Sequence, residues 1–478
     1  MNPIAEITSY ESAVARMYAL GHELAQTPSH KFDLAHMRVL LAALNHPETR
    51  FPGILIAGTN GKGSTAATLA AILEASGLKT GLYTSPHLLR INERIRINGA
   101  QISDGDFASY HDLVDRAAER LVSEGHLPWH PSFFEMLTAI AFEYFAQNKV
   151  DIAVLEVGMG GRLDATNVVE PLISVITDIS LDHQKFLGDT VAEIANEKAG
   201  IIRPGGVVVT LPQHPEANDV IGNKILELEA RAVSAVPYVP PVSPGSADYF
   251  GMDDVALSRY PMQVMGKQIM VETPLIGRHQ FRNVALAIAA AAELGAIPTS
   301  GRGWGGHFPI SAESIEIGIR QTNWPGRFQV LPAQGDSPEF ILDVAHNPAG
   351  AWALRSTLSA RYEDRRLVFV FGAMRDKAIG EIAEILFPLA HTVIATRADN
   401  PRSATVEEIR EAAVRASTDI LDAPDVATAL ESAKALAGHD GVVVVTGSIY
   451  VVGEAMRALG VDLEDARLSH KVQAGRNS

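Results

Sequence analysis

The residues best suited to chemistry form a glycine-rich segment after a short apolar run, Gly53 to Ala57. The segment reads Gly58-Thr59-Asn60-Gly61-Lys62-Gly63-Ser64. Glycines let backbone amides turn towards an anion, and the start of a helix adds partial positive charge. Lys62 could neutralise a phosphate and Ser64 could face a magnesium ion. The segment predicts a phosphate-binding loop, although Gly63 separates Lys62 from Ser64, unlike the common pattern. A plain glycine-rich turn is the alternative.

A second group of polar residues follows two further apolar runs. Glu156 ends one run, and His183 comes shortly after the next, Leu172 to Thr177. Because the carboxyl ends of parallel strands share one sheet edge, both side chains should lie near the phosphate loop. For Glu156 we expect magnesium binding, with a salt bridge as the alternative. Glu197 and Lys198 follow on a predicted helix, where by themselves they would form a solvated charge pair.

The last third of the chain also has polar residues directly after predicted apolar strands. Asp343 and His346 follow the run from Phe340, and Ser448 follows the last predicted strand. Arg327 lies near a predicted domain boundary, from where it could reach a nucleotide. These positions are again the edge at which ligands meet a parallel sheet.

The elements that must position these residues alternate between short apolar runs and segments of helical period. This pattern predicts an α/β fold with a mostly parallel sheet covered on both faces. A composition shift between Gly301 and Gly326 predicts a boundary near Asn323, giving domains of residues 1–322 and 323–478, the second smaller and doubly wound. A small added sheet or hairpin is expected between Pro244 and Phe281. The expected strands are Gly53–Ala57, Lys79–Tyr83, Asp151–Val157, Leu172–Thr177, Val207–Thr210, Phe340–Val344, Leu367–Phe371, Thr392–Thr396 and Gly441–Thr446.

Composition narrows the possible functions of the 478 residues. The formal charge of −16 argues against diffuse binding to nucleic acid or to an anionic membrane. The absence of cysteine excludes thiolate nucleophiles, disulfides and Cys-ligated zinc. The longest uninterrupted apolar stretch, Val284 to Ala292, is too short to span a bilayer. We expect a cytoplasmic protein.

Taken together, these segments resemble the folylpolyglutamate synthase and dihydrofolate synthase family of the Mur ligase superfamily. The Gly63 insertion is the family's own form of the loop. The resemblance implies a large P-loop ATP-binding domain and a smaller C-terminal Rossmann-like Mur ligase domain. The motifs that carry it, in chain order, are Gly58 to Ser64, Ser85-Pro86-His87-Leu88, Phe134-Glu135, Glu156 to Asn167, Leu181-Asp182-His183, Glu197 to Ile201, Pro325-Gly326-Arg327 and Asp343 to Pro348.

The resemblance also implies a set of site residues. Lys62, Lys198 and His346 are the expected catalytic residues, and Lys198 looks like the lysine that is carbamylated in the family to bind a second magnesium ion. The loop from Thr59 to Ser64 would hold the ATP phosphates, with further nucleotide contacts from Asn283, Arg327 and Asp343. The first magnesium ion would be held by Ser85, Glu156 and His183. The implied pterin positions are Gln26, Thr27, Pro28, Ser29, Ser132, Leu163, Asp164 and Ala165, and those for glutamate are His346 and Ser448.

The activity that the resemblance implies is ATP-driven amide formation through an acyl phosphate. We expect a bifunctional, monomeric enzyme that joins L-glutamate to dihydropteroate and to reduced folates. Its alternatives are a monofunctional synthase of either type, a Mur-type ligase for a cell-wall precursor and a phosphate-loop NTPase that acts as a switch or motor. A regulatory protein with a degenerate nucleotide site is the alternative that is not an enzyme.

Overall fold

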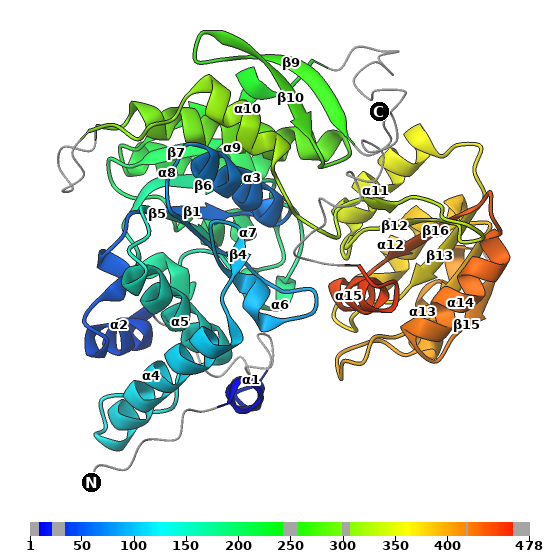
Figure 1. Ribbon diagram of the computed structural model, residues 1–478, viewed down its shortest axis with the longest axis horizontal. Helices are drawn as coiled ribbons and strands as arrows, with labels where there is room; N and C mark the ends of the chain where they lie inside the picture. The colour runs from blue at the N-terminus through cyan, green and yellow to red at the C-terminus, as the bar shows by residue number, and fades with distance from the viewer. Residues whose placement is uncertain (1–8, 22–33, 242–256, 299–305, 417–418, 462–478) are drawn as a thin grey trace, which may run out of the picture. The chain divides into compact units, whose positions relative to one another are not determined.

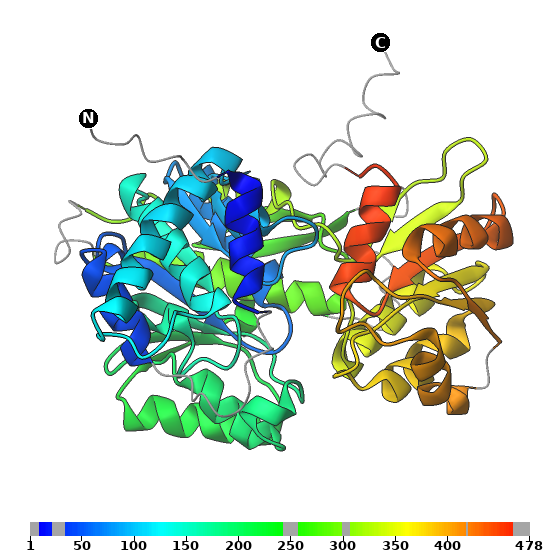
Figure 2. The ribbon, with the colours of Figure 1, turned by 90° about the horizontal axis from the view of Figure 1, so that it is seen from below.

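The computed structural model describes residues 9–21, 34–241, 257–298, 306–416 and 419–461. The chain forms two compact units (Figures 1 and 2). The first consists of Met1–Val239, Met262–Ile269 and Arg282–Ile319, and the second of Pro240–Pro261, Met270–Phe281 and Arg320–Ser478. Within the described residues, no helix is both long and apolar enough to cross a membrane.

An eight-stranded sheet forms the centre of the first unit, in the order β4-β3-β2-β5-β1-β6-β7-β8. The run from β2 to β8 pairs in parallel, whereas β3 and β4 pair antiparallel at one edge. The central strands are buried along their whole length, which explains their near-continuous apolar sequence. The strands are β1 (Gly53–Ala57), β2 (Thr80–Tyr83), β3 (Ile95–Ile97), β4 (Ala100–Gln101), β5 (Ile152–Glu156), β6 (Pro171–Ile176), β7 (Val207–Thr210) and β8 (Arg231–Ser234).

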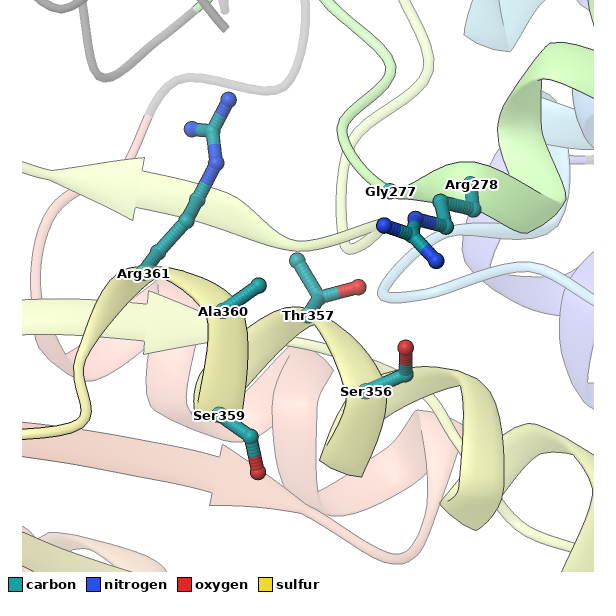
Figure 3. Close-up of a pocket in the computed structure, with 7 residues that line it drawn as sticks. All are labelled: Gly277, Arg278, Ser356, Thr357, Ser359, Ala360 and Arg361. Carbon is teal, nitrogen blue, oxygen red and sulfur yellow. The ribbon is translucent and has the colours of Figure 1, made fainter. Parts of the chain in front are cut away.

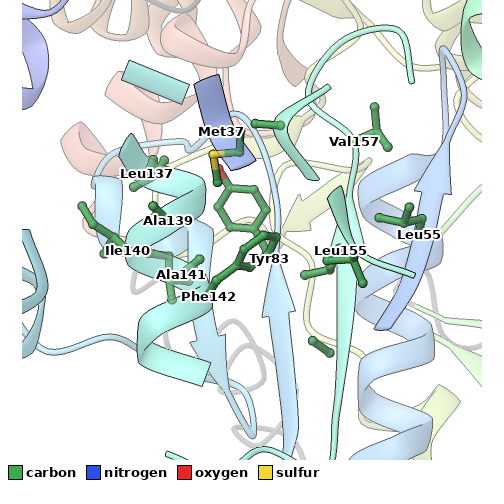
Figure 4. Close-up of a cluster of buried hydrophobic side chains, with 14 of the residues drawn as sticks. Met37, Leu55, Tyr83, Leu137, Ala139, Ile140, Ala141, Phe142, Leu155 and Val157 are labelled. Atoms are coloured by element: carbon green, nitrogen blue, oxygen red, sulfur yellow. The ribbon is translucent and has the colours of Figure 1, made fainter. Parts of the chain in front are cut away.

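Helices bury their apolar sides against this sheet. Figure 4 shows Phe142 and its helical neighbours facing Tyr83 of β2 and Leu155 of β5. Phe142 and Tyr83 are completely buried, so this packing fixes the strands that end at the proposed ligand edge. The helices of this unit are α1 (Tyr10–Ala19), α2 (Leu34–Ala43), α3 (Lys62–Ala75), α4 (Asp104–Ser123), α5 (Phe133–Gln147), α6 (Gln184–Leu187), α7 (Val191–Ala199), α8 (Pro215–Glu227) and α10 (Ala312–Arg320).

A separate two-stranded hairpin, β9 (Ser258–Val264) and β10 (Lys267–Thr273), confirms the small added sheet expected before Phe281. Buried and exposed residues alternate along β9, as they do in a strand with one face covered. Met265 and Gly266 both have positive φ, which suits the tight two-residue turn that joins the strands. Helix α9 (Arg278–Ala296) follows the hairpin.

The second unit contains a six-stranded sheet in the order β11-β12-β16-β13-β14-β15. Only β11 runs antiparallel to its neighbour, β12. The predicted α/β architecture is therefore confirmed in both sheets. The strands are β11 (Gln329–Leu331), β12 (Glu339–Leu342), β13 (Leu367–Phe371), β14 (Thr392–Ala395), β15 (Ile420–Asp422) and β16 (Val442–Thr446). The helices are α11 (Pro348–Arg361), α12 (Ile379–Leu386), α13 (Val406–Ala412), α14 (Val426–Ala437) and α15 (Ile449–Ala458).

Five strands were absent from the sequence-based expectation: β3, β4, β8, β11 and β15. They are short and lie at or beside a sheet edge. Four of them are half-buried or exposed along most of their length, so they lack the continuous apolar run that marks a central parallel strand. The sequence therefore predicted only those strands that are buried on both faces of a sheet.

Candidate functional site

The glycine-rich loop turns sharply between β1 and α3, and two glycines make the turn possible. Gly58 has φ +154°, and a Cβ there would lie 1.8 Å from the Thr177 Oγ1. Gly61 has φ +88°, and a Cβ there would lie 2.1 Å from the Asn283 Oδ1. Only glycine fits these two positions without displacing a neighbour.

The loop after β6 supports this turn. The backbone N–H groups of Thr59 and Asn60 donate to the Asp178 carbonyl at 2.8 and 3.1 Å. The Thr59 hydroxyl donates to the Ser180 carbonyl, and the Asn60 amide donates to the Ser180 hydroxyl. The glycine-rich loop is therefore held in place before any ligand binds.

Two lysines converge on a single carbonyl oxygen of the loop. Lys62 Nζ donates to the carbonyls of Gly58 and Thr59, each at 3.2 Å, and Lys198 Nζ donates to the Gly58 carbonyl at 2.7 Å. Burial and then the neighbouring Lys62 charge lower the pKa of Lys198 from 10.5 to about 7. The positive charge of Lys62 suits this part of the sheet edge to anions. The lowered pKa of Lys198 means that its amine loses its proton readily.

The expectation that Glu197 and Lys198 form a solvated pair is wrong. Lys198 is only 4% exposed, whereas Glu197 accepts from Arg162 at 2.8 Å. Consecutive residues on a helix point in directions about 100° apart, so one faces the sheet edge and the other the surface. Sequence spacing alone does not indicate which is which.

Glu156 and Ser85, two residues of the expected magnesium set, are hydrogen-bonded to each other. Glu156 ends β5 and is 4% exposed, and its Oε2 accepts from the Ser85 backbone N–H at 3.1 Å. Ser85 follows β2, the strand beside β5, and its peptide bond to Pro86 is cis. Parallel pairing of these two strands brings the residues together.

His183 lies in the segment after β6, with a left-handed backbone at φ +51°. Its backbone N–H donates to the Asp182 Oδ1 at 2.8 Å, and its Nε2 lies 3.9 Å from the Asp182 Oδ2. Within the described ranges, no three His, Asp or Glu side chains gather as a metal cluster by themselves. The expected metal set differs from such a cluster because it includes a hydroxyl and a modified lysine.

Helix α9 carries Arg282, whose ion pair with Asp178 sequence reasoning missed. Arg282 donates to both carboxylate oxygens of Asp178, with Nε to Oδ2 at 3.0 Å. Beside it, Asn283 is 4% exposed, and its carbonyl accepts from the Thr65 hydroxyl at 3.4 Å. No sequence signal pairs Arg282 with the distant Asp178, although Arg282 adjoins the predicted site residue Asn283.

The described pterin candidates are held by local hydrogen bonds. Ser132 caps α5 in a reciprocal box with Glu135. The buried Asp164 carboxylate accepts from Met159 and Thr166; burial raises its pKa, and these hydrogen bonds oppose the increase. Leu163 is half-buried, and Ala165 begins a short 3-10 helix. The remaining candidates, Gln26 to Ser29, lie outside the described residues.

In the second unit, Asp343 follows β12 and accepts from the backbone N–H groups of Phe328 and Ala345 at 2.8 and 2.9 Å. Burial raises the pKa of Asp343, and the nearby Arg327 charge opposes this increase. His346 Nδ1 donates to the Val344 carbonyl at 2.9 Å, which fixes the hydrogen on that nitrogen.

Ser448 lies at the end of β16, the strand beside β12, and caps α15 by accepting from the Tyr450 N–H at 3.2 Å. The structure therefore places Asp343, His346 and Ser448 after parallel strands, as the sequence predicted, and it shows that these two strands are neighbours.

Comparison with known proteins agrees with this arrangement. The Mur ligase middle domain matches residues 134–291, and the Mur ligase glutamate ligase domain matches residues 326–449. Dihydrofolate synthase/folylpolyglutamate synthase from Bacillus subtilis is 34% identical over 439 residues, which cover 90% of this chain and 95% of the relative.

Two solved structures show the same fold over nearly the whole chain. Mycobacterium tuberculosis folylpolyglutamate synthase complexed with ADP has a TM-score of 0.79 and 30% identity, covering 95% of this chain and 99% of that chain. A bifunctional folylpolyglutamate synthase/dihydrofolate synthase from Yersinia pestis, complexed with AMPPNP and a Mn ion, has a TM-score of 0.75 and 31% identity, with the same coverage.

The fold and the two matched domains define an ATP-dependent ligase of the Mur ligase superfamily. Its two matched segments follow one another along the chain in the order middle domain, then glutamate ligase domain. Within that superfamily, the chain belongs to the dihydrofolate synthase/folylpolyglutamate synthase family.

Proposed function

We propose that the protein joins L-glutamate to dihydropteroate, making dihydrofolate, and to reduced folates, making folylpolyglutamates. The observation that carries this is the convergence of Lys62 and Lys198 on the Gly58 carbonyl, next to a strand end that holds Glu156. The B. subtilis relative is named for both activities, which supports a bifunctional enzyme over a monofunctional one.

The nucleotide phosphates would be held by the loop from Thr59 to Ser64. Its amides lie at the start of α3, where a helix favours anions, and Lys62 adds a full positive charge. Asn283, Arg327 and Asp343 would contact the rest of the nucleotide. The relatives complexed with ADP and with AMPPNP support this role.

A magnesium ion fits the donor set of Ser85, Glu156 and His183. Carboxylate and hydroxyl oxygens are hard ligands of the kind that magnesium prefers, and Glu156 is a buried carboxylate at a strand end. When bound, such an ion neutralises phosphate charge.

Lys198 would be carbamylated and would bind a second magnesium ion. Its neutral amine forms a bond to the carbon of CO2 and loses a proton, giving an anionic carbamate. The carbamate nitrogen keeps one hydrogen, which can still donate to the Gly58 carbonyl as the amine does at 2.7 Å. The pKa of about 7 makes the neutral amine available near neutral pH.

The reaction would proceed through an acyl phosphate. The substrate carboxylate attacks the γ-phosphorus of ATP and ADP leaves; the glutamate amine then attacks the acyl carbon and releases phosphate. Lys62 spreads the charge of the transferring phosphoryl group, and positioning of the two substrates supplies much of the acceleration. His346 and Ser448 would bind glutamate, with His346 contributing to catalysis.

The pterin ring would be held by Gln26, Thr27, Pro28, Ser29, Ser132, Leu163, Asp164 and Ala165. Because Ser132 and Asp164 use their side-chain oxygens in local hydrogen bonds, they would mainly shape this site. We further propose that the chain has two domains, residues 1–322 and 323–478, and that it is a monomer located in the cytoplasm. Its partners would be small molecules only, with neither nucleic acid nor membrane among them.

The test measures phosphate release and product mass with ATP, magnesium and glutamate, comparing dihydropteroate with a reduced folate monoglutamate. Turnover with both acceptors is expected, and the Lys62→Ala protein supplies the background rate. Turnover with only one acceptor would make the enzyme monofunctional. ATP turnover independent of both would indicate a switch or motor, and no turnover with either would refute the proposal.

A further inference from the structure

The second unit contains a cavity that none of the proposed roles uses. It has a volume of about 330 Å³, near the lower limit for small-molecule sites, and it is open to solvent. Figure 3 shows it between the segment that begins α9 and the last turns of α11. The residues used below are Gly277, Arg278, Ser356, Thr357, Ser359 and Arg361.

The lining is cationic and rich in hydrogen-bond donors. It includes Arg278 and Arg361, and none of the described residues that line it is acidic. Two side-chain nitrogens of Arg361, Nε and Nη2, are buried, so Arg278 is the more accessible of the two cations. Figure 3 shows Arg278 extending from α9 above Thr357 and Ser356. The hydroxyls of Ser356 and Ser359 belong to exposed residues, so a solute can reach them. Guanidinium and hydroxyl donors together suit carboxylate or phosphate oxygens.

The helix ends add smaller contributions that partly oppose each other. Arg278 is the first residue of α9, where the helix dipole favours an anion. The other side is the end of α11, where the dipole disfavours one, and Arg361 in that last turn offsets it. The positive charge of Arg278 therefore adds to that of the α9 N-terminus, and both favour an anion.

The backbone at Gly277 closely approaches the Thr357 side chain of α11 at this cavity. Gly277 has φ +111°, and a Cβ there would lie 2.7 Å from the Thr357 Oγ1. Thr357 is buried, and its hydroxyl donates to the Ala353 carbonyl at 3.0 Å, so it serves the helix rather than a ligand.

The cavity also lies apart from the sheet edge proposed to bind glutamate in this unit. Helix α11 begins at Pro348, directly after His346 and Asn347, whereas the cavity lies along Ser356 to Arg361. At about 1.5 Å per helical residue, the two ends of the 14-residue α11 are separated by roughly 20 Å. The cavity is thus not a part of the proposed glutamate site.

We propose that this cavity binds a small molecule carrying two or more carboxylate or phosphate groups. One source is a γ-linked glutamate chain, in which each added glutamate contributes one more carboxylate. This source rests on the proposed function. The other source is a free compound with phosphate groups. Both offer oxyanions to Arg278 and to the hydroxyls of Ser356 and Ser359, and the test distinguishes them.

The test is calorimetric titration of the full chain with tri-γ-glutamate and, separately, with pyrophosphate. It is done without ATP or pteridine and in the Lys62→Ala background, which weakens binding at the phosphate loop. One of the two probes is expected to bind, and Arg278→Gln should weaken that binding about tenfold, the effect of losing a charged hydrogen-bond donor. Arg366→Gln is the matched control, since Arg366 is exposed and does not line the cavity.

A second variant, Ser356→Glu, places a negative charge in the cavity at an exposed helical position and should abolish binding without unfolding α11. Binding of tri-γ-glutamate alone identifies the carboxylate source, and binding of pyrophosphate alone identifies the phosphate source. Binding of neither probe, or equal binding by Arg278→Gln and Arg366→Gln, would overturn the proposal. Because no ligation is measured, a failure of the proposed function leaves this result unaffected.

Discussion

The loop after β1 in the first unit and the loop after β12 in the second have the same topology and opposite charge. Each follows an inner strand of a parallel sheet and leads into a helix, α3 or α11. At the first loop, Lys62 and the α7 residue Lys198 both donate to the Gly58 carbonyl. The second buries a carboxylate, Asp343, under two backbone N–H groups. The shared topology fixes where ligands meet the sheet, and the side chains fix which ligand charge is stabilised.

The largest expected effect is that of Lys62→Ala on the phosphate loop. Loss of one charged donor at the transferring phosphoryl group should lower kcat by about 10²- to 10³-fold. Phosphate release at saturating ATP and magnesium measures this effect, with circular dichroism to show that the fold is kept. Lys224→Ala, which removes an ion pair with Glu227 on α8, is the control and should leave the rate unchanged. A wild-type rate in Lys62→Ala would refute the role given to this lysine.

The second prediction concerns Lys198, because carbamylation should replace its positive charge by a negative one and so change the charge at the first loop. The intact protein should carry the mass of one carbamate, and Lys198→Ala should lose most activity, about 10²-fold if the carbamate holds a metal. A short carboxylic acid should restore part of it by supplying the missing oxygens. Mass spectrometry under non-acidic conditions and rescue kinetics test this, and an unmodified lysine in a fully active preparation would contradict it.

The lowered pKa of Lys198 should make both the stability of the protein and the extent of carbamylation depend on pH. The unmodified amine has a folded-state pKa of about 7 and an ordinary value of 10.5, so between these values the unfolded chain binds more protons. The stability contributed by this group therefore rises as pH increases from about 7 towards 10.5. Carbamate should likewise increase from pH 6 to pH 8, as the neutral fraction grows; NMR with ¹³C-bicarbonate measures this increase. A carbamate signal that falls with pH would contradict the assignment.

A smaller effect on rate, with a cost in stability, is expected for Asp343→Asn. Asparagine has one carbonyl oxygen, so either the Phe328 or the Ala345 N–H would lose its acceptor and face an NH₂ group. An unsatisfied buried donor costs about 1–3 kcal/mol of unfolding free energy. Denaturant unfolding measures this loss, with the exposed Asp336→Asn as control. Unchanged stability would show that the second loop does not depend on this carboxylate.

The smallest effect is expected from Arg282, which links α9 to the loop after β6 through Asp178. Both side chains are about one-third exposed, so the pair should contribute less than about 1 kcal/mol to stability. Arg282→Ala should raise KM for ATP by no more than about fivefold, because the phosphate loop loses only indirect support. Arg282→Lys keeps the charge but not the paired geometry, so it should lie between Ala and wild type. An effect as large as that of Lys62→Ala would contradict this ranking.

The sequence predicted the strands that carry the site because those strands are buried on both faces. The expected bounds of β1, β7 and β13 match the observed ones, and those of β5 and β16 differ only at the ends. The edge strands β8 and β15 were missed, because their exposed positions take polar residues that break the apolar run. The pairing of Arg282 with Asp178 was also beyond sequence reasoning, since it depends on how α9 packs.

What the sequence determined by itself is the order of strand, loop and helix, and the residue types at each strand end. These features depend on local residue types. Glycines after an apolar run favour a turn of the backbone, and a continuously apolar strand is stable only when it is buried. The tertiary structure alone decided which side chains meet. It buried Lys198 against the Gly58 carbonyl while its neighbour Glu197 paired with Arg162, and it placed Ser85 against Glu156. The physical reason is that desolvation and hydrogen bonding depend on neighbours distant in sequence, which only the packed sheet and its helices bring together.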